Sequence, residues 1–155
     1  MAELEPPAAA LTAPPRCVPV LQVVRRAEPV ALGQVSAAAG KMAGDCVFWA
    51  ARAALRGEVG AIVTAPLHKE ALSAAGAPYS LYPGHTELLQ AVAAEHLGVP
   101  VAELPVRMML ANDELRTVLV SIHVSLVDAI KAVTQPQILQ TLRITHEALS
   151  KNLGR

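Results

Sequence analysis

The chain has 155 residues, enough for one domain with a buried core and too few for two comfortable ones. Hydrophobic residues make up 53% of it, the formal net charge is zero, and no basic stripe is present, which argues against nucleic acid as a partner. Two cysteines without paired spacing do not indicate a disulfide framework or a zinc ribbon. The acidic start MAELEPP is unlike a secretory peptide, and no uncharged apolar run approaches the roughly 20 residues that cross a membrane. We therefore expect a soluble, cytoplasmic protein without a membrane partner.

The first part of the chain is rich in proline and alanine and lacks periodicity. We expect residues 1–27 to form a Pro/Ala-rich leader that is partly disordered, with a short strand over 18–24. Over residues 33–56, apolar side chains recur every three or four positions, which predicts a long helix. Cys46 and Trp49 lie on this apolar stripe, so we expect both to serve the core.

The next segment, IVTAPLHKEALSAAGAPYSLYPGHTE, places Lys, His and Thr among turn-forming Gly and Pro. A strand is predicted over residues 60–64, and it ends before Pro66 because proline lacks the N–H that a strand ladder needs. Residues 68–75 favour a helix, and Gly76 follows them where a left-handed cap is wanted. An exposed loop is predicted over residues 77–84.

A further helix is predicted to begin at His85 or Thr86, because Leu88, Leu89 and Val92 recur after them at helical spacing. A helix start presents unpaired backbone N–H groups and the positive end of the helix dipole. A histidine and a threonine hydroxyl beside these groups make a cradle for a phosphate or a carboxylate. The spacing alone does not name a reaction.

The last third of the chain predicts two strands and two helices. The strands cover residues 106–110 and 115–123, and a turn-favouring Asn-Asp pair between them suggests a hairpin. One helix runs from a cap at Ser125 through residue 133, and the other covers residues 135–153. Helices and strands alternate along the chain, so we expect the α/β class, with a mixed sheet flanked by helices.

Several of these pieces occur together, in an order that points to a known family. The stretches VTAPLHKEALSAAG, PGHTELL, MML and LRTVLVSIHVSLVDAIKAVT, with GQVSAAAG before them, resemble the PdxA family, the 4-hydroxythreonine-4-phosphate dehydrogenases of pyridoxal phosphate biosynthesis. The resemblance covers about residues 28–153 and matches a middle portion of the longer family chain. It implies that residues 28–155 form a partial PdxA-like domain with part of an isocitrate/isopropylmalate dehydrogenase-like fold.

The resemblance also implies an activity. Members of the family oxidise 4-phosphooxy-L-threonine with NAD, and the product loses carbon dioxide. A divalent metal, zinc, magnesium or cobalt, acts as a Lewis acid, and the active site lies at a homodimer interface. By motif match, His85 and Thr86 bind the phosphorylated substrate and His123 binds the metal. No catalytic or NAD-binding residue is assigned in this sequence.

Other family motifs are absent from the sequence. The glycine-rich GEPAGIGP-like start, the NPHAGE-like segment, the second and third metal histidines and the NAD region have no counterpart here. One histidine does not hold a catalytic metal that needs three, so we expect a truncated member that lacks dehydrogenase activity alone. Two alternatives stay open: a 4-phospho-threonate or phospho-erythronate dehydrogenase, and a non-catalytic remnant that keeps only dimerisation or ligand binding.

Simpler roles compete with these assignments. His85 and Thr86 also fit a loop histidine beside an ordinary Thr cap, and His123 fits a histidine satisfied at a strand end. Lys69 fits a surface lysine as well as one that steers an anionic substrate. His68, beside Lys69, has weaker support for such a role. His96 and His146 lie on predicted helices and are expected to pack or to lie on the surface. Finally, an incomplete sheet exposes strand edges and apolar surface, so we expect the chain to pair, aggregate or unfold more easily than a whole enzyme.

Overall fold

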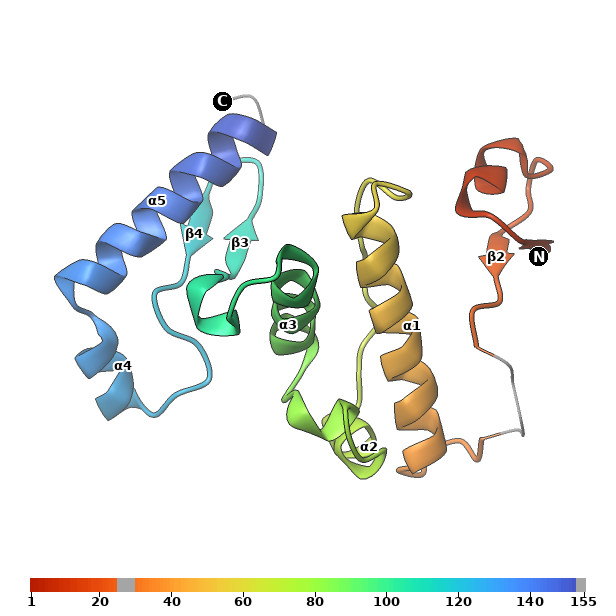
Figure 1. The fold of residues 1–155 in the computed structure, drawn as a ribbon, viewed down its shortest axis with the longest axis horizontal. Helices are drawn as coiled ribbons and strands as arrows, with labels where there is room; N and C mark the ends of the chain where they lie inside the picture. Colours follow the sequence, from red (N-terminus) through yellow and green to blue (C-terminus); the bar gives the residue numbers. More distant parts are fainter. Residues whose placement is uncertain (25–29, 153–155) are drawn as a thin grey trace. The chain divides into compact units, whose positions relative to one another are not determined.

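The structure is a computed structural model, which describes residues 1–24 and 30–152 (Figure 1). The chain divides into two compact units, Met1–Leu104 and Pro105–Arg155, and each is described by itself. Within the described residues, no helix combines the length and the apolar character needed to cross a membrane.

The N-terminal segment contains short regular elements. Strand β1 (Ala2–Leu4) pairs in parallel with β2 (Pro19–Leu21), and a 3-10 helix η1 (Pro7–Thr12) lies between them in the chain. The strand predicted over 18–24 is therefore present in a shorter form. Regular structure before it was not expected. The predicted boundary at residue 27 lies outside the described residues and stays a prediction.

The long helix α1 (Ala37–Leu55) confirms the predicted helix over 33–56, although it begins four residues later. Its start is set by Ser36, whose Oγ accepts a hydrogen bond from the Ala39 backbone N–H at 3.3 Å. After its C-terminus, Gly57 adopts a positive φ of 74°, a conformation that glycine reaches without a Cβ penalty.

The buried side of α1 differs from the predicted apolar stripe. The residues buried along it are Gly40, Gly44, Val47 and Ala51, with Ala53 further on. Cys46 is exposed and Trp49 is half-buried, so the expectation that both serve the core is wrong. The helix turns its smallest residues inward because its neighbours approach very closely. A Cβ added to Gly40 would lie only 1.8 Å from the backbone oxygen of Ala71.

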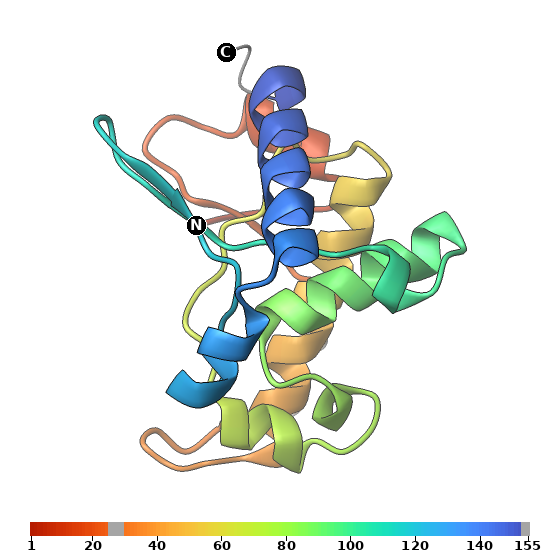
Figure 2. The same ribbon diagram turned by 90° about the vertical axis from the view of Figure 1, so that its left-hand side faces the viewer.

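The elements after α1 pack against this glycine-bearing side. Helix α2 (Lys69–Ala74) lies beside the first half of α1 in two perpendicular views (Figures 1 and 2). It is followed by η2 (Tyr79–Leu81), α3 (His85–Leu97) and η3 (Val101–Glu103). Tyr79 is only 8% exposed, so the prediction of an exposed loop over residues 77–84 is wrong at that residue.

One core cluster joins α1 and α3. Its buried members are Val47, Ala51, Leu88 and Val92, and partly buried apolar side chains surround them. Ile62 is one of these surrounding side chains and comes from the segment where a strand was predicted. That prediction, over 60–64, is wrong for the described residues: the segment is irregular, and no described strand pairs with it. Val63 in this segment is 96% exposed.

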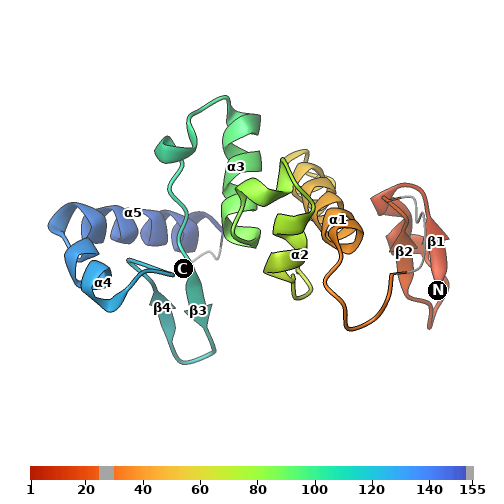
Figure 3. The same cartoon turned by 90° about the horizontal axis from the view of Figure 1, so that it is seen from below.

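The second unit begins with a hairpin, as predicted. Strand β3 (Met109–Ala111) pairs antiparallel with β4 (Arg116–Val118), and both strands are shorter than expected (Figure 3). The side-chain oxygen of Asn112 accepts hydrogen bonds from the backbone N–H groups of Glu114, at 3.0 Å, and Leu115, at 2.7 Å. These two bonds hold the turn closed.

Two helices complete this unit. Ser125 caps α4 (Leu126–Ala132), as predicted, by accepting a hydrogen bond from the Asp128 backbone N–H at 3.3 Å. Helix α5 (Gln135–Asn152) confirms the last predicted helix, and position 153 lies outside the described residues. The α/β class is confirmed, but the described strands form two separate two-stranded sheets, one parallel and one antiparallel, in place of one mixed sheet.

Candidate functional site

The helix start that was predicted to bind an anion is present at His85. Gly84 precedes α3 as its N-cap. Because glycine has no side chain, it gives the helix no capping hydrogen bond of that kind. His85 and Thr86 therefore occupy the first two helical positions, and both are half-buried. The interpretation of Thr86 as an ordinary cap is wrong, because glycine caps this helix. The backbone N–H groups of the first turn receive no capping side chain, which leaves them for an anion or for water.

His85 also lines a groove of about 300 Å³, which we call the His85 groove. One wall comes from α1, through Ala43, Cys46 and Ala50, and the other comes from the extended segment 62–67. Most of this lining is apolar, and the Thr64 hydroxyl adds a polar group. The irregular segment that failed to form a strand is thus the feature that shapes the groove.

The Cys46 thiol faces this groove but is not an activated nucleophile. Desolvation raises the pKa of the Cys46 thiol above its ordinary 9.0, and the neighbouring Asp45 carboxylate raises it further. The thiol therefore stays protonated near neutral pH, whereas a reactive cysteine requires the thiolate.

A cation and a carboxylate flank the start of α3. A Cβ added to Gly84 would lie 3.9 Å from Lys69 Cε and 3.6 Å from Glu87 Oε2. The Lys69 side chain therefore passes beside the loop that leads into His85. The sequence left Lys69 without a role. The Glu87 carboxylate at the same point offsets the Lys69 charge, so both interpretations of Lys69, a surface lysine and one that steers an anion, stay open.

The other histidines of the described chain have structural or surface positions, which was expected for His96 and His146. His68 is the N-cap of α2, and its Nδ1 accepts a hydrogen bond from the Ala71 backbone N–H at 3.3 Å. His96 is exposed in the last turn of α3, and His146 is exposed on α5. The capping role of His68 was not recognised from the sequence, because histidine is an uncommon N-cap.

His123 belongs to the second unit. It is exposed in a bend before α4, and its φ of 56° is uncommon for a residue with a Cβ. The predicted strand that was to end at His123 ends at Val118, so His123 does not lie at the carboxyl end of a strand. Nowhere in residues 1–24 and 30–152 do three His, Cys, Asp or Glu side chains gather as a metal site. The described residues therefore do not fit a complete metal site, and the metal role of His123 stays a prediction.

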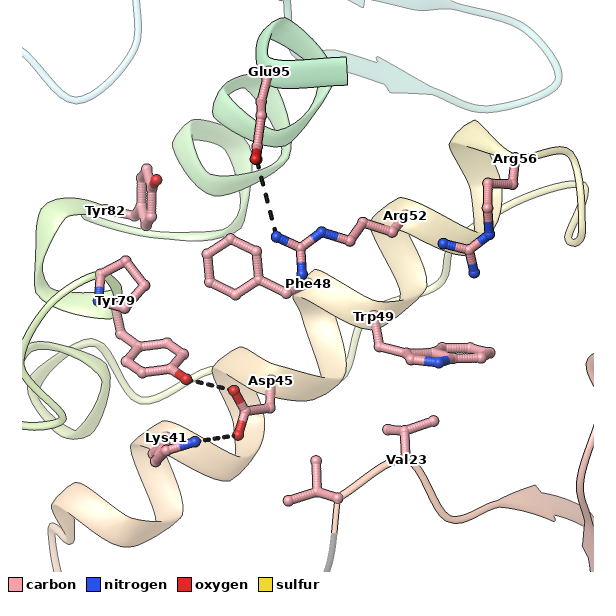
Figure 4. A pocket seen from close by; sticks show the side chains of 12 residues that line it. Val23, Lys41, Asp45, Phe48, Trp49, Arg52, Arg56, Tyr79, Tyr82 and Glu95 are labelled. Atoms are coloured by element: carbon pink, nitrogen blue, oxygen red, sulfur yellow. Dashed lines mark hydrogen bonds and ion pairs between the residues drawn. The ribbon is translucent and has the colours of Figure 1, made fainter.

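A second and larger groove, of about 790 Å³, lies on another face of α1 and was not predicted from the sequence (Figure 4). We call it the aromatic groove. It is lined by Phe48, Trp49, Tyr79 and Tyr82 together with charged side chains that include Lys41, Asp45 and Arg52. The one available signal was the clustering of the few aromatic residues between positions 48 and 82.

Comparisons with known proteins identify the family. The family model described as pyridoxal phosphate biosynthetic protein PdxA matches residues 2–155. A 4-hydroxythreonine-4-phosphate dehydrogenase of Beijerinckia indica is 49% identical over 118 residues, which are 76% of this chain and 32% of that protein. A protein of Oceanobacillus iheyensis with a provisional name as a D-threonate 4-phosphate dehydrogenase is 35% identical over 129 residues, 81% of this chain and 34% of that protein.

A solved structure from Salmonella typhimurium, described provisionally as a 4-hydroxythreonine-4-phosphate dehydrogenase, superposes with a TM-score of 0.76 at 34% identity. The superposition covers 96% of this chain and 43% of that structure, which confirms the predicted dehydrogenase-like α/β fold. The chain spans about a third of the length of the curated relatives it matches. On the family match across residues 2–155, the chain belongs to the PdxA family of pyridoxal phosphate biosynthetic proteins.

Proposed function

We propose that the chain forms the substrate-binding part of a PdxA-type dehydrogenase and that it lacks dehydrogenase activity by itself. The reaction of the complete site is the NAD-dependent, metal-assisted oxidation and decarboxylation of 4-phosphooxy-L-threonine. The observation that carries the proposal is the position of His85 and Thr86, half-buried at the start of α3, where the first-turn N–H groups receive no capping side chain, and beside an apolar groove. Relatives named for this activity support the choice of substrate.

Each group at this site has a role in the proposal. The first-turn N–H groups of α3 and the Thr86 hydroxyl donate to a phosphate or carboxylate of the substrate. The His85 imidazole adds a further donor, and Lys69 supplies a compensating positive charge beside the loop. Apolar side chains of α1, including Ala43 and Ala50, shield these bonds from water and so strengthen them.

For the metal, the proposal names one ligand, and for NAD it names no binding residue. A divalent metal supplies Lewis-acid chemistry to this reaction when it is bound, and His123 is proposed as one of its ligands. Because the described residues do not gather three ligands, no step is assigned to a metal held by them. A homodimer with the active site at its interface, and a cytoplasmic location, are further parts of the same proposal.

Binding of the substrate tests the role of the helix start. Isothermal titration of the chain with 4-phosphooxy-L-threonine is expected to show one site. His85→Ala and Thr86→Val are each expected to weaken binding about tenfold, as for the loss of one hydrogen bond to a charged group. His96→Ala is the matched control, because it removes an exposed histidine from the other end of the same helix. If all three variants bind the substrate as tightly as the original chain, the proposed site is ruled out.

Activity tests the second half of the proposal. NAD reduction is followed by absorbance with saturating substrate and zinc, magnesium or cobalt. No turnover above the background without protein is expected. Metal-dependent turnover by the purified chain would show that a complete active site assembles from it.

The Oceanobacillus iheyensis relative favours a second candidate, a dehydrogenase acting on a sugar-acid phosphate such as D-threonate 4-phosphate. The two candidates differ in one substituent, an amino group in the first substrate and a hydroxyl in the second. Titration of both compounds against the chain separates them, because the preferred substrate binds more tightly. A chain that binds either compound but shows no affinity for a divalent metal in a parallel titration favours the non-catalytic remnant.

A further inference from the structure

Helix α2 begins at a histidine that acts as its N-cap. The Nδ1 atom of His68 accepts a partly buried hydrogen bond from the Ala71 backbone N–H at 3.3 Å. Serine, threonine, aspartate and asparagine fill this role in most helices, and their side-chain oxygens accept throughout the neutral pH range. A histidine cap differs from these because its acceptor is a nitrogen that takes up a proton in that range.

The capping bond requires one protonation state of the His68 ring. A neutral imidazole has one nitrogen with a free lone pair, and here that nitrogen is Nδ1, because it meets a backbone N–H. In the imidazolium both nitrogens carry a proton, so neither accepts. The added positive charge also lies at the positive end of the α2 dipole, which is unfavourable. Histidine changes charge between about pH 5 and pH 8, so both effects act within that range.

The charged neighbours of His68 do not hold its ring in either state. His68 is exposed, so protons from solvent reach it, and its neighbours in α2 are the oppositely charged Lys69 and Glu70. Helix α2 packs against α1 and η2, and Lys69 lies beside the start of α3. The titratable groups in the first half of α1, in η2 and at the start of α3 are Lys41, Asp45, Cys46, Tyr79, His85 and Glu87. None of the ion pairs between described residues includes His68.

The helix that His68 begins is short and closely packed. Helix α2 has six residues, of which Ala71 is 6% and Leu72 is 0% exposed. Its backbone approaches α1 so closely that a Cβ at Gly40 would meet the Ala71 backbone oxygen. A helix of this length makes few hydrogen bonds of its own, so the bond at its cap is a large share of what fixes its first turn.

The cap also connects two parts of the proposed substrate site. Pro66 and Leu67, which come immediately before His68, line the His85 groove. Lys69, which follows His68, passes beside Gly84 at the start of α3. Loss of the capping bond therefore loosens one wall of the groove and the lysine next to it.

We propose that His68 is a pH-sensitive cap, which orders α2 and the adjoining wall of the His85 groove at about pH 7.5 and releases them at about pH 5.5. The stabilisation is present while the ring is neutral and is lost as the pH falls and the ring takes up a proton. The inference rests on the proposed function only for its effect on substrate binding, because the capping bond itself does not involve the substrate.

Two variants separate the cap from its titration. His68→Asn keeps a side-chain acceptor for the same N–H and does not titrate, whereas His68→Ala removes the acceptor. Hydrogen–deuterium exchange of residues 69–74 is measured by mass spectrometry at about pH 7.5 and about pH 5.5. Chains are compared at the same pH, so the pH dependence of amide exchange itself cancels.

At about pH 7.5, the original chain is expected to exchange like His68→Asn, and His68→Ala about fivefold faster, as for the loss of one cap. At about pH 5.5, the original chain is expected to exchange about fivefold faster than His68→Asn and at least as fast as His68→Ala. His96→Asn, at an exposed histidine of α3, is the matched control and is expected to keep the pH response of the original chain.

The proposal is overturned if the original chain exchanges like His68→Asn at both pH values, because protonation would then leave the cap intact. It is also overturned if His68→Ala matches His68→Asn at about pH 7.5, since the capping bond would then contribute nothing to α2. Loss of the pH response in His96→Asn would assign that response to a different histidine and overturn the role of His68.

Titration with 4-phosphooxy-L-threonine tests the effect on the groove. The original chain is expected to bind this compound as tightly as His68→Asn at about pH 7.5 and about fivefold more weakly at about pH 5.5. Equal affinity of the two chains at about pH 5.5 would overturn the link between the cap and the groove. If neither chain binds the compound at either pH, the proposed function fails, while the exchange measurement still decides whether His68 is a pH-sensitive cap.

Discussion

Two glycines of α1 decide how closely its neighbours approach. The Cβ of an alanine at Gly40 would meet the Ala71 backbone oxygen at 1.8 Å, and at Gly44 it would meet the Tyr79 ring at 2.4 Å. A backbone oxygen cannot rotate away as a side chain can. We therefore expect Gly40→Ala to reduce the free energy of unfolding by about 3 kcal/mol, at the upper end for overpacking, and Gly44→Ala by about 1–2 kcal/mol. Urea unfolding followed by circular dichroism measures both.

The control for this prediction is Gly60→Ala. An added Cβ at Gly60 meets nothing within 4 Å, and the backbone there does not require a positive φ. That variant is expected to be neutral or slightly stabilised, because alanine restricts the unfolded chain. If Gly40→Ala is as stable as Gly60→Ala, the close contact between α1 and α2 is not present in solution.

The Asp45 carboxylate gives a pH-dependent contribution to stability. Partial burial alone would raise its pKa, but hydrogen bonds from Lys41 and Tyr79 outweigh burial and lower the pKa from the ordinary 3.8. A lowered pKa in the folded state means that the stabilisation is present above pH 3.8 and is lost as the pH falls through the folded value. Because Lys41 is more than half exposed, solvent screens the pair. We expect Asp45→Asn to cost no more than about 1 kcal/mol at pH 7.

The difference between Asp45→Asn and the original chain is expected to shrink steadily below pH 4 in urea unfolding at fixed ionic strength. Asp113→Asn, in the exposed hairpin turn, is the matched control and is expected to show no such trend. A difference that stays constant from pH 7 to pH 3 would mean that the carboxylate charge is not stabilised in the folded state.

At the scale of whole elements, helices followed from the sequence better than strands did. A helix satisfies its own backbone and is bounded by local signals, such as the caps at Ser36 and Ser125 and the left-handed glycines Gly76 and Gly98. A strand depends on a partner that local sequence does not supply. The segment 60–64 has the apolar character of a buried strand but finds no partner among the described residues.

The candidate site shows the same division between local and tertiary information. His85 and Thr86 were placed at a helix start by local pattern alone, and the structure has them there. The aromatic groove required positions 48, 49, 79 and 82 to meet in space, which only packing determines. Tyr79 approaches α1 closely because Gly44 has no Cβ, which would otherwise meet the Tyr79 ring.

In the second unit, one arginine ties the segment just before β3 to α5. The Arg107 Nε donates to Thr141 Oγ1 at 2.8 Å, and its Nη2 donates to Gln140 Oε1 at 2.6 Å. Thr141 is 6% exposed, so its hydroxyl loses a buried partner if the guanidinium is removed. Arg107→Lys keeps the charge but not the fork of donors. We expect this variant to lose about 1–2 kcal/mol of stability and to speed amide exchange in α5, measured by mass spectrometry.

Arg116→Lys is the control, because Arg116 is exposed on β4 of the same hairpin. It is expected to exchange like the original chain. Equal exchange rates for Arg107→Lys and Arg116→Lys would show that charge alone, without the donor geometry, holds this contact.

For the molecule as a whole, burial is distributed very unevenly between the two units. All the buried apolar residues of the described chain lie between Val47 and Ala94, in the first unit. In the described part of the second unit, Thr141 is the buried residue, while Leu126, Ile130 and Leu142 are 79%, 68% and 60% exposed. This much exposed apolar surface supports the expectation that the chain self-associates as its concentration rises.

The uneven burial predicts two levels of stability within one chain. Protection against amide exchange follows the buried contacts that must be lost for a segment to open. We therefore expect α1 and α3 to exchange most slowly and α4 and α5 to exchange at least about tenfold faster, in a dilute sample measured by hydrogen–deuterium exchange with mass spectrometry. Raising the concentration is expected to slow exchange in α4 and α5, because association covers their apolar side chains. Uniform protection across both units in a dilute sample would contradict this, since it would mean that the second unit gains its stability from contacts other than its own.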